Sequence, residues 1–210
     1  MAYALIDPPG VVGYTLGPSR YLNVTNRCTL RCAFCPKFNG SWEVGGHDLR
    51  LRREPTAAEL VAAAGDPRSY RELVFCGFGE CTLRLYVVLE AAAELKRLGA
   101  RRVRVNTDGL ANLVHQRDVT PDFEGNIDAV SISINAQSEA VYQRHCRPPV
   151  PGAWQAVQRF AAAVTEFVPE VTLTAIDGLE GVDIHACARL AERMGLGFRA
   201  RTLDVVGLPV

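Results

Sequence analysis

The stretch that decides the fold is a short strand followed by three closely spaced cysteines: Tyr21-Leu22-Asn23-Val24-Thr25-Asn26-Arg27-Cys28-Thr29-Leu30-Arg31-Cys32-Ala33-Phe34-Cys35. Residues 21–25 predict a strand, and the cysteines follow with C-x3-C-x2-C spacing. Three thiolates on one short loop can converge on one metal centre. A cubane iron–sulfur cluster normally takes four cysteines, so three protein ligands leave one iron open to another ligand. We therefore expect Cys28, Cys32 and Cys35 to hold a [4Fe-4S] cluster with one open position.

Two other interpretations of the cysteines stay open at this point. A structural zinc site needs four ligands, and the fourth would have to be Cys76, Cys81 or His47. Three buried structural cysteines on one short loop are the other alternative.

Outward from this stretch, predicted strands alternate with predicted helices. The strands are residues 21–25, 72–76, 103–106, 128–134, 171–176 and 197–203, and the helices are 57–65, 82–99, 153–167 and 183–194. A capping-box pattern from Thr56 to Glu59 marks the first helix start. Such alternation predicts a parallel sheet. Six units are too few for a closed eight-stranded barrel, so we expect an α/β fold, a partial, open (β/α)6 barrel with helices outside. Its chemistry should lie at the carboxyl ends of the strands.

Length and composition fit one domain covering residues 1–210, with an N-terminal extension at 1–20 and a core at 21–203. Lys plus Arg and Asp plus Glu each number 23, so the net charge is zero and gives no electrostatic case for direct nucleic-acid or membrane binding. No signal peptide or membrane-spanning stretch is predicted. Seven cysteines without an export signal favour metal binding over disulfides, and a cytoplasmic location. Residues 38–53 predict a long loop, a candidate lid over the barrel mouth.

The cysteine loop, with Phe34 directly before the last cysteine, resembles that of the radical S-adenosylmethionine (SAM) superfamily. The resemblance implies that the open iron binds the amino and carboxylate groups of SAM. One electron from the reduced cluster then cleaves SAM to methionine and a 5′-deoxyadenosyl radical. It also implies an electron donor such as flavodoxin or ferredoxin.

Later strand ends offer the SAM contacts that this resemblance implies. Gly77-Phe78-Gly79-Glu80 is similar to the superfamily's GGE segment, in which Glu80 would neutralise the methionine ammonium. Asn106 and Thr107 end the next strand, and Ser133 and Asn135 would contact the ribose. Arg199 and Arg201 lie two apart on one predicted strand face and suit a carboxylate of SAM or of a substrate. The expected SAM-binding residues are Phe34, Gly77, Phe78, Gly79, Glu80, Asn106, Thr107, Ser133, Asn135 and Arg199.

A narrower resemblance is to the TatD-linked radical SAM proteins, over about residues 21–203. It rests on the segments 21–28, 74–80, 84–85, 106–112, 132–136 and 198–201. It implies a functional link to a TatD-type nuclease. Cys81 departs from the usual proline and Asp108 from the usual asparagine. We expect Cys81 to be an inert small hydrophobe, and Cys76, Cys146 and Cys187 to be inert too.

We therefore predict an enzyme whose radical abstracts hydrogen from an unidentified substrate. Alternatives are a small-molecule modifier resembling 7-carboxy-7-deazaguanine synthase, a glycyl-radical activase, or an iron–sulfur redox sensor that does not turn over SAM. The polar residues selected as substrate contacts are Lys37, Asn39, Arg84, Asp108 and Arg201. No general base can be named from the sequence.

Overall fold

The computed structural model describes residues 7–203, which form a seven-stranded sheet. In spatial order the strands are β1 (Gly13–Leu16), β2 (Ser19–Asn23), β5 (Glu72–Cys76), β6 (Val103–Thr107), β7 (Ala129–Ser133), β8 (Glu170–Asp177) and β9 (Gly197–Thr202). All neighbours from β2 to β9 are parallel, and β1 pairs antiparallel with β2. Within the described residues β1 and β9 are free edges and the sheet stays open, which confirms the predicted partial barrel.

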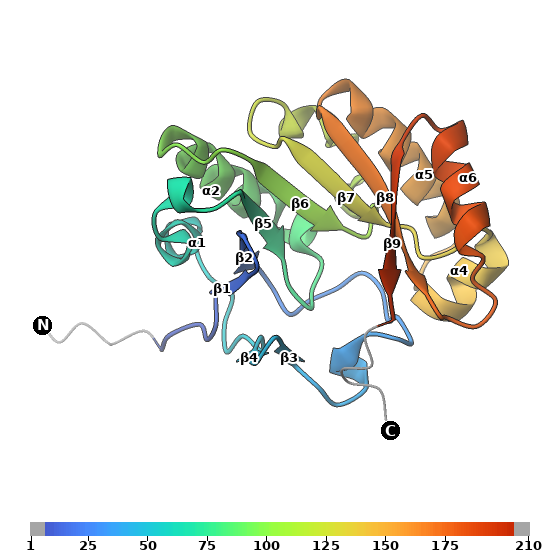
Figure 1. The fold of residues 1–210 in the computed structure, drawn as a ribbon, viewed down its shortest axis with the longest axis horizontal. Helices are drawn as coiled ribbons and strands as arrows, with labels where there is room; N and C mark the ends of the chain where they lie inside the picture. Colours follow the sequence, from blue (N-terminus) through green and yellow to red (C-terminus); the bar gives the residue numbers. More distant parts are fainter. Residues whose placement is uncertain (1–6, 204–210) are drawn as a thin grey trace, which may run out of the picture.

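Helices cover the outer side of this sheet (Figure 1). They are α1 (Ala57–Ala64), α2 (Leu85–Arg97), α3 (Ala111–His115), α4 (Glu139–Cys146), α5 (Ala153–Ala163) and α6 (Ile184–Arg193). The capping box at the start of α1 forms as predicted, because Thr56 accepts from the Glu59 backbone and Glu59 accepts from that of Thr56. The predicted helix at 153–167 ends earlier, since residues 164–166 form a 3-10 turn. Sequence patterns missed β1, α3 and α4.

The two faces of the sheet differ in chemistry. Val103, Val105, Val130, Ile132 and Leu173 belong to the main hydrophobic core. The alternate positions of the same strands carry polar side chains, because successive residues of a strand point to opposite faces. These are Arg104, Asn106, Ser131, Ser133 and Thr174, and they line a cavity. One face therefore holds the fold together, and the other is free to bind a ligand.

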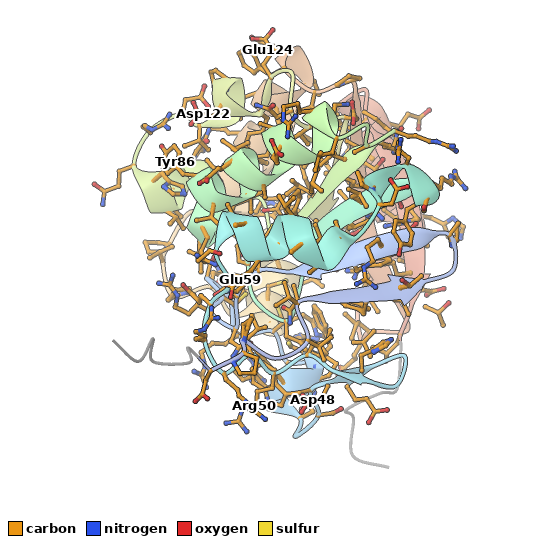
Figure 2. The ribbon with its side chains drawn as sticks, turned by 90° about the vertical axis from the view of Figure 1, so that its left-hand side faces the viewer. Asp48, Arg50, Glu59, Tyr86, Asp122 and Glu124 are labelled. Carbon is orange, nitrogen blue, oxygen red and sulfur yellow. The ribbon has the colours of Figure 1, made fainter. Side chains whose placement is uncertain are left out.

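Residues 38–53 are more ordered than the predicted loop. They contain a small hairpin of β3 (Glu43–Val44) and β4 (His47–Asp48), preceded by a 3-10 turn at Pro36–Phe38. The Asn23 amide donates to the Leu49 carbonyl at 2.8 Å. Asp48 and Arg50 lie at the opposite end of the molecule from Asp122 and Glu124, and the helices α1 and α2 lie between these two pairs (Figure 2).

Asn26 completes this anchoring by pairing with the backbone of Leu51, as donor at 2.7 Å and as acceptor at 3.1 Å. Leu49 and Leu51 are themselves buried. The segment is thus fastened to the chain directly before the cysteine loop.

In the described part of the chain no helix is both long and apolar enough to cross a bilayer. The longest, α2, has 13 residues, whereas a span needs about 20.

Candidate functional site

A cavity of about 610 Å³ lies at the carboxyl ends of the parallel strands. Its volume is within the range of small-molecule sites, roughly 300–1,000 Å³. All three cysteines of the loop and all ten residues selected for SAM binding line it, as do two of the substrate candidates. In chain order these are Cys28, Cys32, Phe34, Cys35, Gly77, Phe78, Gly79, Glu80, Asn106, Thr107, Asp108, Ser133, Asn135, Arg199 and Arg201. The fold thus brings residues from six parallel strands to one mouth.

Three substrate candidates lie outside the cavity lining and hold the chain instead. Lys37 donates to the Asn26 carbonyl at 3.0 Å, and Asn39 donates to the Ala33 carbonyl at 3.0 Å. Arg84 donates to the Pro55 carbonyl at 2.6 Å and pairs with Glu54 at 3.2 Å. Their polar groups are used to fix the cysteine loop and its surroundings. The structure therefore gives these three side chains a supporting place, contrary to the substrate role expected of them.

The cysteine loop is anchored on the end of α4. The backbone of Arg31 donates to the Cys146 carbonyl at 3.2 Å, and that of Ala33 donates to the His145 carbonyl at 2.8 Å. A further bond from the Cys35 backbone to the Cys32 carbonyl, 3.1 Å, closes a tight turn. The loop is thus held by main-chain bonds, and all seven cysteines are free thiols.

The electrostatics of the loop fit a bound cation. Burial, then the carboxyls of Asp108 and Glu80, raise the pKa of Cys28 to about 12. The Cys146 thiol beside it, followed by burial, raises the pKa of Cys32 well above its usual value, and burial raises that of Cys35. These environments disfavour thiolates in the protein alone. Iron would supply the positive charge that stabilises them.

The arrangement of the thiols bears on which metal group fits. Among residues 7–203 no three His, Cys, Asp or Glu side chains are grouped to hold a single ion. In a cubane each cysteine binds a different iron, so the three sulfurs need not meet at one point. The donor set therefore fits an iron–sulfur cluster.

Glu80 connects the carboxyl ends of β5 and β6 through hydrogen bonds to its carboxylate. The residue is 4% exposed, and its carboxylate accepts four hydrogen bonds from N–H and O–H groups. Three reach Oε1, from the Thr82 backbone at 2.9 Å, the Thr82 hydroxyl at 2.7 Å and the Thr107 hydroxyl at 2.8 Å. The fourth joins Oε2 to the Asp108 backbone at 2.6 Å. Glu80, rather than Thr82, caps the turn before α2, and it ties the end of β5 to the end of β6.

Gly77 and Gly79 serve contacts within the chain. A Cβ on Gly77 would lie 2.3 Å from the Asn23 Oδ1, and one on Gly79 would lie 2.2 Å from the Thr25 carbonyl. The sequence suggested that these glycines let the backbone approach a ligand. In the structure they also let the turn after β5 pack against the start of the cysteine loop, where the Glu80 backbone donates to the Arg27 carbonyl at 2.8 Å.

Substituting Gly79 with alanine is expected to destabilise the protein by roughly 1–3 kcal/mol, because the methyl group meets two backbone carbonyls that cannot move independently. Urea denaturation measures this free energy of unfolding. Gly197→Ala is the matched control, since both glycines have a backbone any residue can adopt and the Gly197 methyl would come no closer than 3.1 Å to its nearest neighbour, the Thr172 hydroxyl. Equal losses in the two variants would contradict the packing argument.

Asp108 has a polar atom without a partner. Its Oδ1 accepts from the Leu110 backbone at 3.0 Å, whereas its buried Oδ2 has no hydrogen bond within the described residues. Burial, followed by the charge of Glu80, raises the pKa of this carboxyl well above its usual range. An orphaned atom on the cavity wall fits a ligand that supplies the missing partner.

Cys81, where the resembled family usually has proline, is fully buried. Its thiol donates to the Asn106 carbonyl at 3.1 Å, and it does not belong to the cavity lining. This agrees with a small core residue. Cys76 and Cys146 lie closer to the site, Cys76 on the cavity wall with its sulfur 3.4 Å from the Tyr14 hydroxyl.

Several lining residues were missed from the sequence. Tyr21, Arg104 and Thr174 line the cavity from within the strands. Arg104 donates to Glu72 at 2.8 and 3.1 Å, which neutralises it. The sequence pattern that could have identified such residues is the alternation of polar and apolar residues along β6 and β7. Once the apolar positions are assigned to the core side of the sheet, the polar positions must lie on the cavity side.

The chain matches the radical SAM superfamily over residues 22–194. It belongs to this superfamily. The superfamily implies a [4Fe-4S] cluster and SAM, and this radical SAM chain is an enzyme of that class. The narrower TatD-linked assignment receives no support from the comparisons.

A curated relative is a probable dual-specificity RNA methyltransferase RlmN from Deinococcus deserti. It is 32% identical over 126 residues, which are 56% of this radical SAM chain. The chain spans about a third of that relative's length, 34%.

Two solved structures share the fold. A radical SAM methyltransferase from Sphaerobacter thermophilus has a TM-score of 0.55 at 17% identity, covering 93% of this chain and 71% of its own. SuiB from Streptococcus suis, solved with S-adenosylmethionine bound, has a TM-score of 0.59 at 12% identity, covering 89% and 38%. At these identities the likeness concerns the fold alone.

Proposed function

We propose that this radical SAM protein binds a [4Fe-4S] cluster through Cys28, Cys32 and Cys35 and cleaves SAM reductively beside it. The observation that carries the proposal is that these cysteines line the same cavity as the polar ends of β5, β6, β7 and β9. When bound, the cluster and SAM supply a radical able to abstract hydrogen from a substrate. The protein supplies orientation and exclusion of water.

Different residues are proposed to contact different parts of SAM. The turn of Gly77, Phe78 and Gly79 presents backbone to the methionine end of SAM, and Glu80 keeps that turn in place. Ser133 and Asn135 are proposed to contact the ribose. Asn135 has a left-handed backbone, φ 53°, its own backbone donates to the Thr174 carbonyl at 3.2 Å, and it lines the cavity.

The direct test is anaerobic reconstitution followed by reduction with dithionite in the presence of SAM. We expect a coloured protein that releases methionine and 5′-deoxyadenosine in equal amounts, measured by mass spectrometry. A cluster that forms but neither cleaves SAM nor changes its electron paramagnetic resonance spectrum on SAM addition would contradict the proposal and favour the redox-sensor alternative.

Methyl transfer is a second candidate, because one relative and one structural neighbour bear methyltransferase names. Here SAM would also be a methyl donor. The same assay separates the two, since a donor role yields S-adenosylhomocysteine in addition to 5′-deoxyadenosine. S-adenosylhomocysteine formation that depends on added RNA would favour this candidate.

The remaining expectations about partners are proposals as well. A reduced flavodoxin or ferredoxin would deliver the electron that dithionite supplies in the assay. A link to a TatD-type nuclease, a deazaguanine-type substrate or a glycyl-radical partner enzyme would each show in copurification or product analysis. Cytoplasmic location is proposed on the reducing environment that free thiols and a cluster require.

A further inference from the structure

The β9 side of the cavity carries two arginines close together. Arg199 and Arg201 both line the cavity and pair in register with Thr174 and Ile176 of β8. One terminal nitrogen of Arg201 donates to the Asn135 Oδ1 at 3.0 Å. Its Nε is buried and has no hydrogen-bond partner within the described residues. The guanidinium is thus held by one arm while other donors remain available.

Arg201, which is partly buried, and Arg199, which is exposed, differ from Arg104 and Arg84, which pair with carboxylates. Arg104 pairs with Glu72 at 2.8 Å, and Arg84 pairs with Glu54 at 3.2 Å. Across residues 7–203 no carboxylate lies within 4.0 Å of Arg199 or Arg201. Burial, followed by the charge of Arg199, lowers the pKa of Arg201. A mostly buried cation beside a second cation is unfavourable unless an anion joins it.

We propose that Arg199 and Arg201 bind an anionic group, a carboxylate or a phosphate, of the molecule on which the radical acts. That the bound molecule is the substrate of the radical rests on the proposed function, whereas the anion site itself rests on the two arginines. The planar fork of guanidinium nitrogens matches both oxyanions. Asn135 orients Arg201 for this contact.

SAM has a carboxylate of its own and is the other source of such an anion. Its amino and carboxylate groups share one carbon, and the amino group is expected beside the turn after β5. Four strand spacings separate β5 from β9, about 19 Å along the sheet at ~4.8 Å each. Cys32 also lies near enough to favour the charge of Arg201, so the subsite adjoins the cysteine loop. Because the sheet curves into a partial barrel and these residues line one cavity, the direct distance is shorter than this arc, and the experiment separates the two sources.

The test measures binding of inorganic phosphate and of SAM to the reconstituted protein by calorimetry. We expect Arg201→Gln to weaken phosphate binding about tenfold or more, the loss of a charge-assisted hydrogen bond. SAM affinity should change less than about threefold, and saturating SAM should leave phosphate binding intact. Arg193→Gln, on exposed α6, is the matched control and should change neither. Arg199→Gln gives a second variant if Arg201→Gln does not fold.

Each contrary result has a definite meaning. Competition between SAM and phosphate, with Arg201→Gln weakening both equally, would assign the site to the SAM carboxylate and overturn the proposal. No phosphate binding, or binding insensitive to both arginine variants, would also overturn it. Asp204→Asn is included because Asp204 lies outside the described residues. A gain in phosphate affinity above tenfold in this variant would mean that the chain itself supplies the anion for the two arginines, which would overturn the proposal. Intact phosphate binding without release of 5′-deoxyadenosine would instead reject the proposed function alone.

Discussion

Replacing Cys32 with alanine is expected to leave the reconstituted protein nearly colourless and to lower SAM cleavage by more than roughly 100-fold, beyond what loss of an outer-shell partner alone costs. The reason is that the three cysteines are the proposed protein ligands of the cluster. The variant keeps only two of them, so a second iron of the cubane loses its protein ligand and the cluster is not held. Iron content, visible absorption and 5′-deoxyadenosine release measure the effect.

Cys187→Ala is the matched control. Cys187 is a buried free thiol on α6 that does not line the cavity, so its removal should leave colour and cleavage unchanged. If the Cys32 variant retains the cluster, the explanation to test is that Cys146, which lies beside Cys32, replaces it as a ligand. If the Cys32→Ala/Cys146→Ala double variant also keeps a cluster and activity, the ligand assignment is wrong.

Replacing Glu80 with alanine should destabilise the fold by roughly 3–5 kcal/mol, the range for removing one partner of a buried charged network. The change strips the acceptor from two backbone N–H groups and from the hydroxyls of Thr82 and Thr107 at once. The free energy of unfolding from urea denaturation measures it.

Two further variants sharpen that measurement. Glu80→Gln should fall between alanine and the natural residue, because an amide oxygen keeps one set of donors while the amide nitrogen faces another donor. Glu90→Ala, on the exposed side of α2, should stay within about 0.5 kcal/mol of the natural protein. A Glu80→Ala loss no larger than that of Glu90→Ala would show that the four bonds do not stabilise the fold.

The fold was largely predictable because its strands have strong local patterns. Residues 72–76 form β5 as predicted, and 103–106 lie within β6, since apolar runs between turn residues fix these elements locally. By contrast β1 was missed because its register depends on pairing with β2, and α3 is only five residues long. The antiparallel pairing of β1 also brings part of the expected N-terminal extension into the sheet.

The candidate site was predicted where chemistry follows a strand end and missed where it lies inside a strand. The cysteines stand out by their C-x3-C-x2-C spacing, and Glu80 by the similarity of its segment to the GGE segment of the superfamily. Arg104 did not, because a charged residue within a strand usually faces solvent. Nor could the sequence show that Arg84 and Lys37 are used by nearby carbonyls. Such pairing depends on distant segments meeting, as when Arg84 reaches Pro55.

The position of Leu203 on the cavity wall has a practical consequence for making fusions of this protein. Seven residues, 204–210, follow it in the sequence. A fully extended chain spans at most about 3.6 Å per residue, so a domain attached seven residues after Leu203 is tethered within about 25 Å of the cavity wall. A purification tag or reporter domain placed there would share space with incoming ligands. Attachment at the amino end, next to the β1 edge of the sheet, keeps such cargo on the far side from β9.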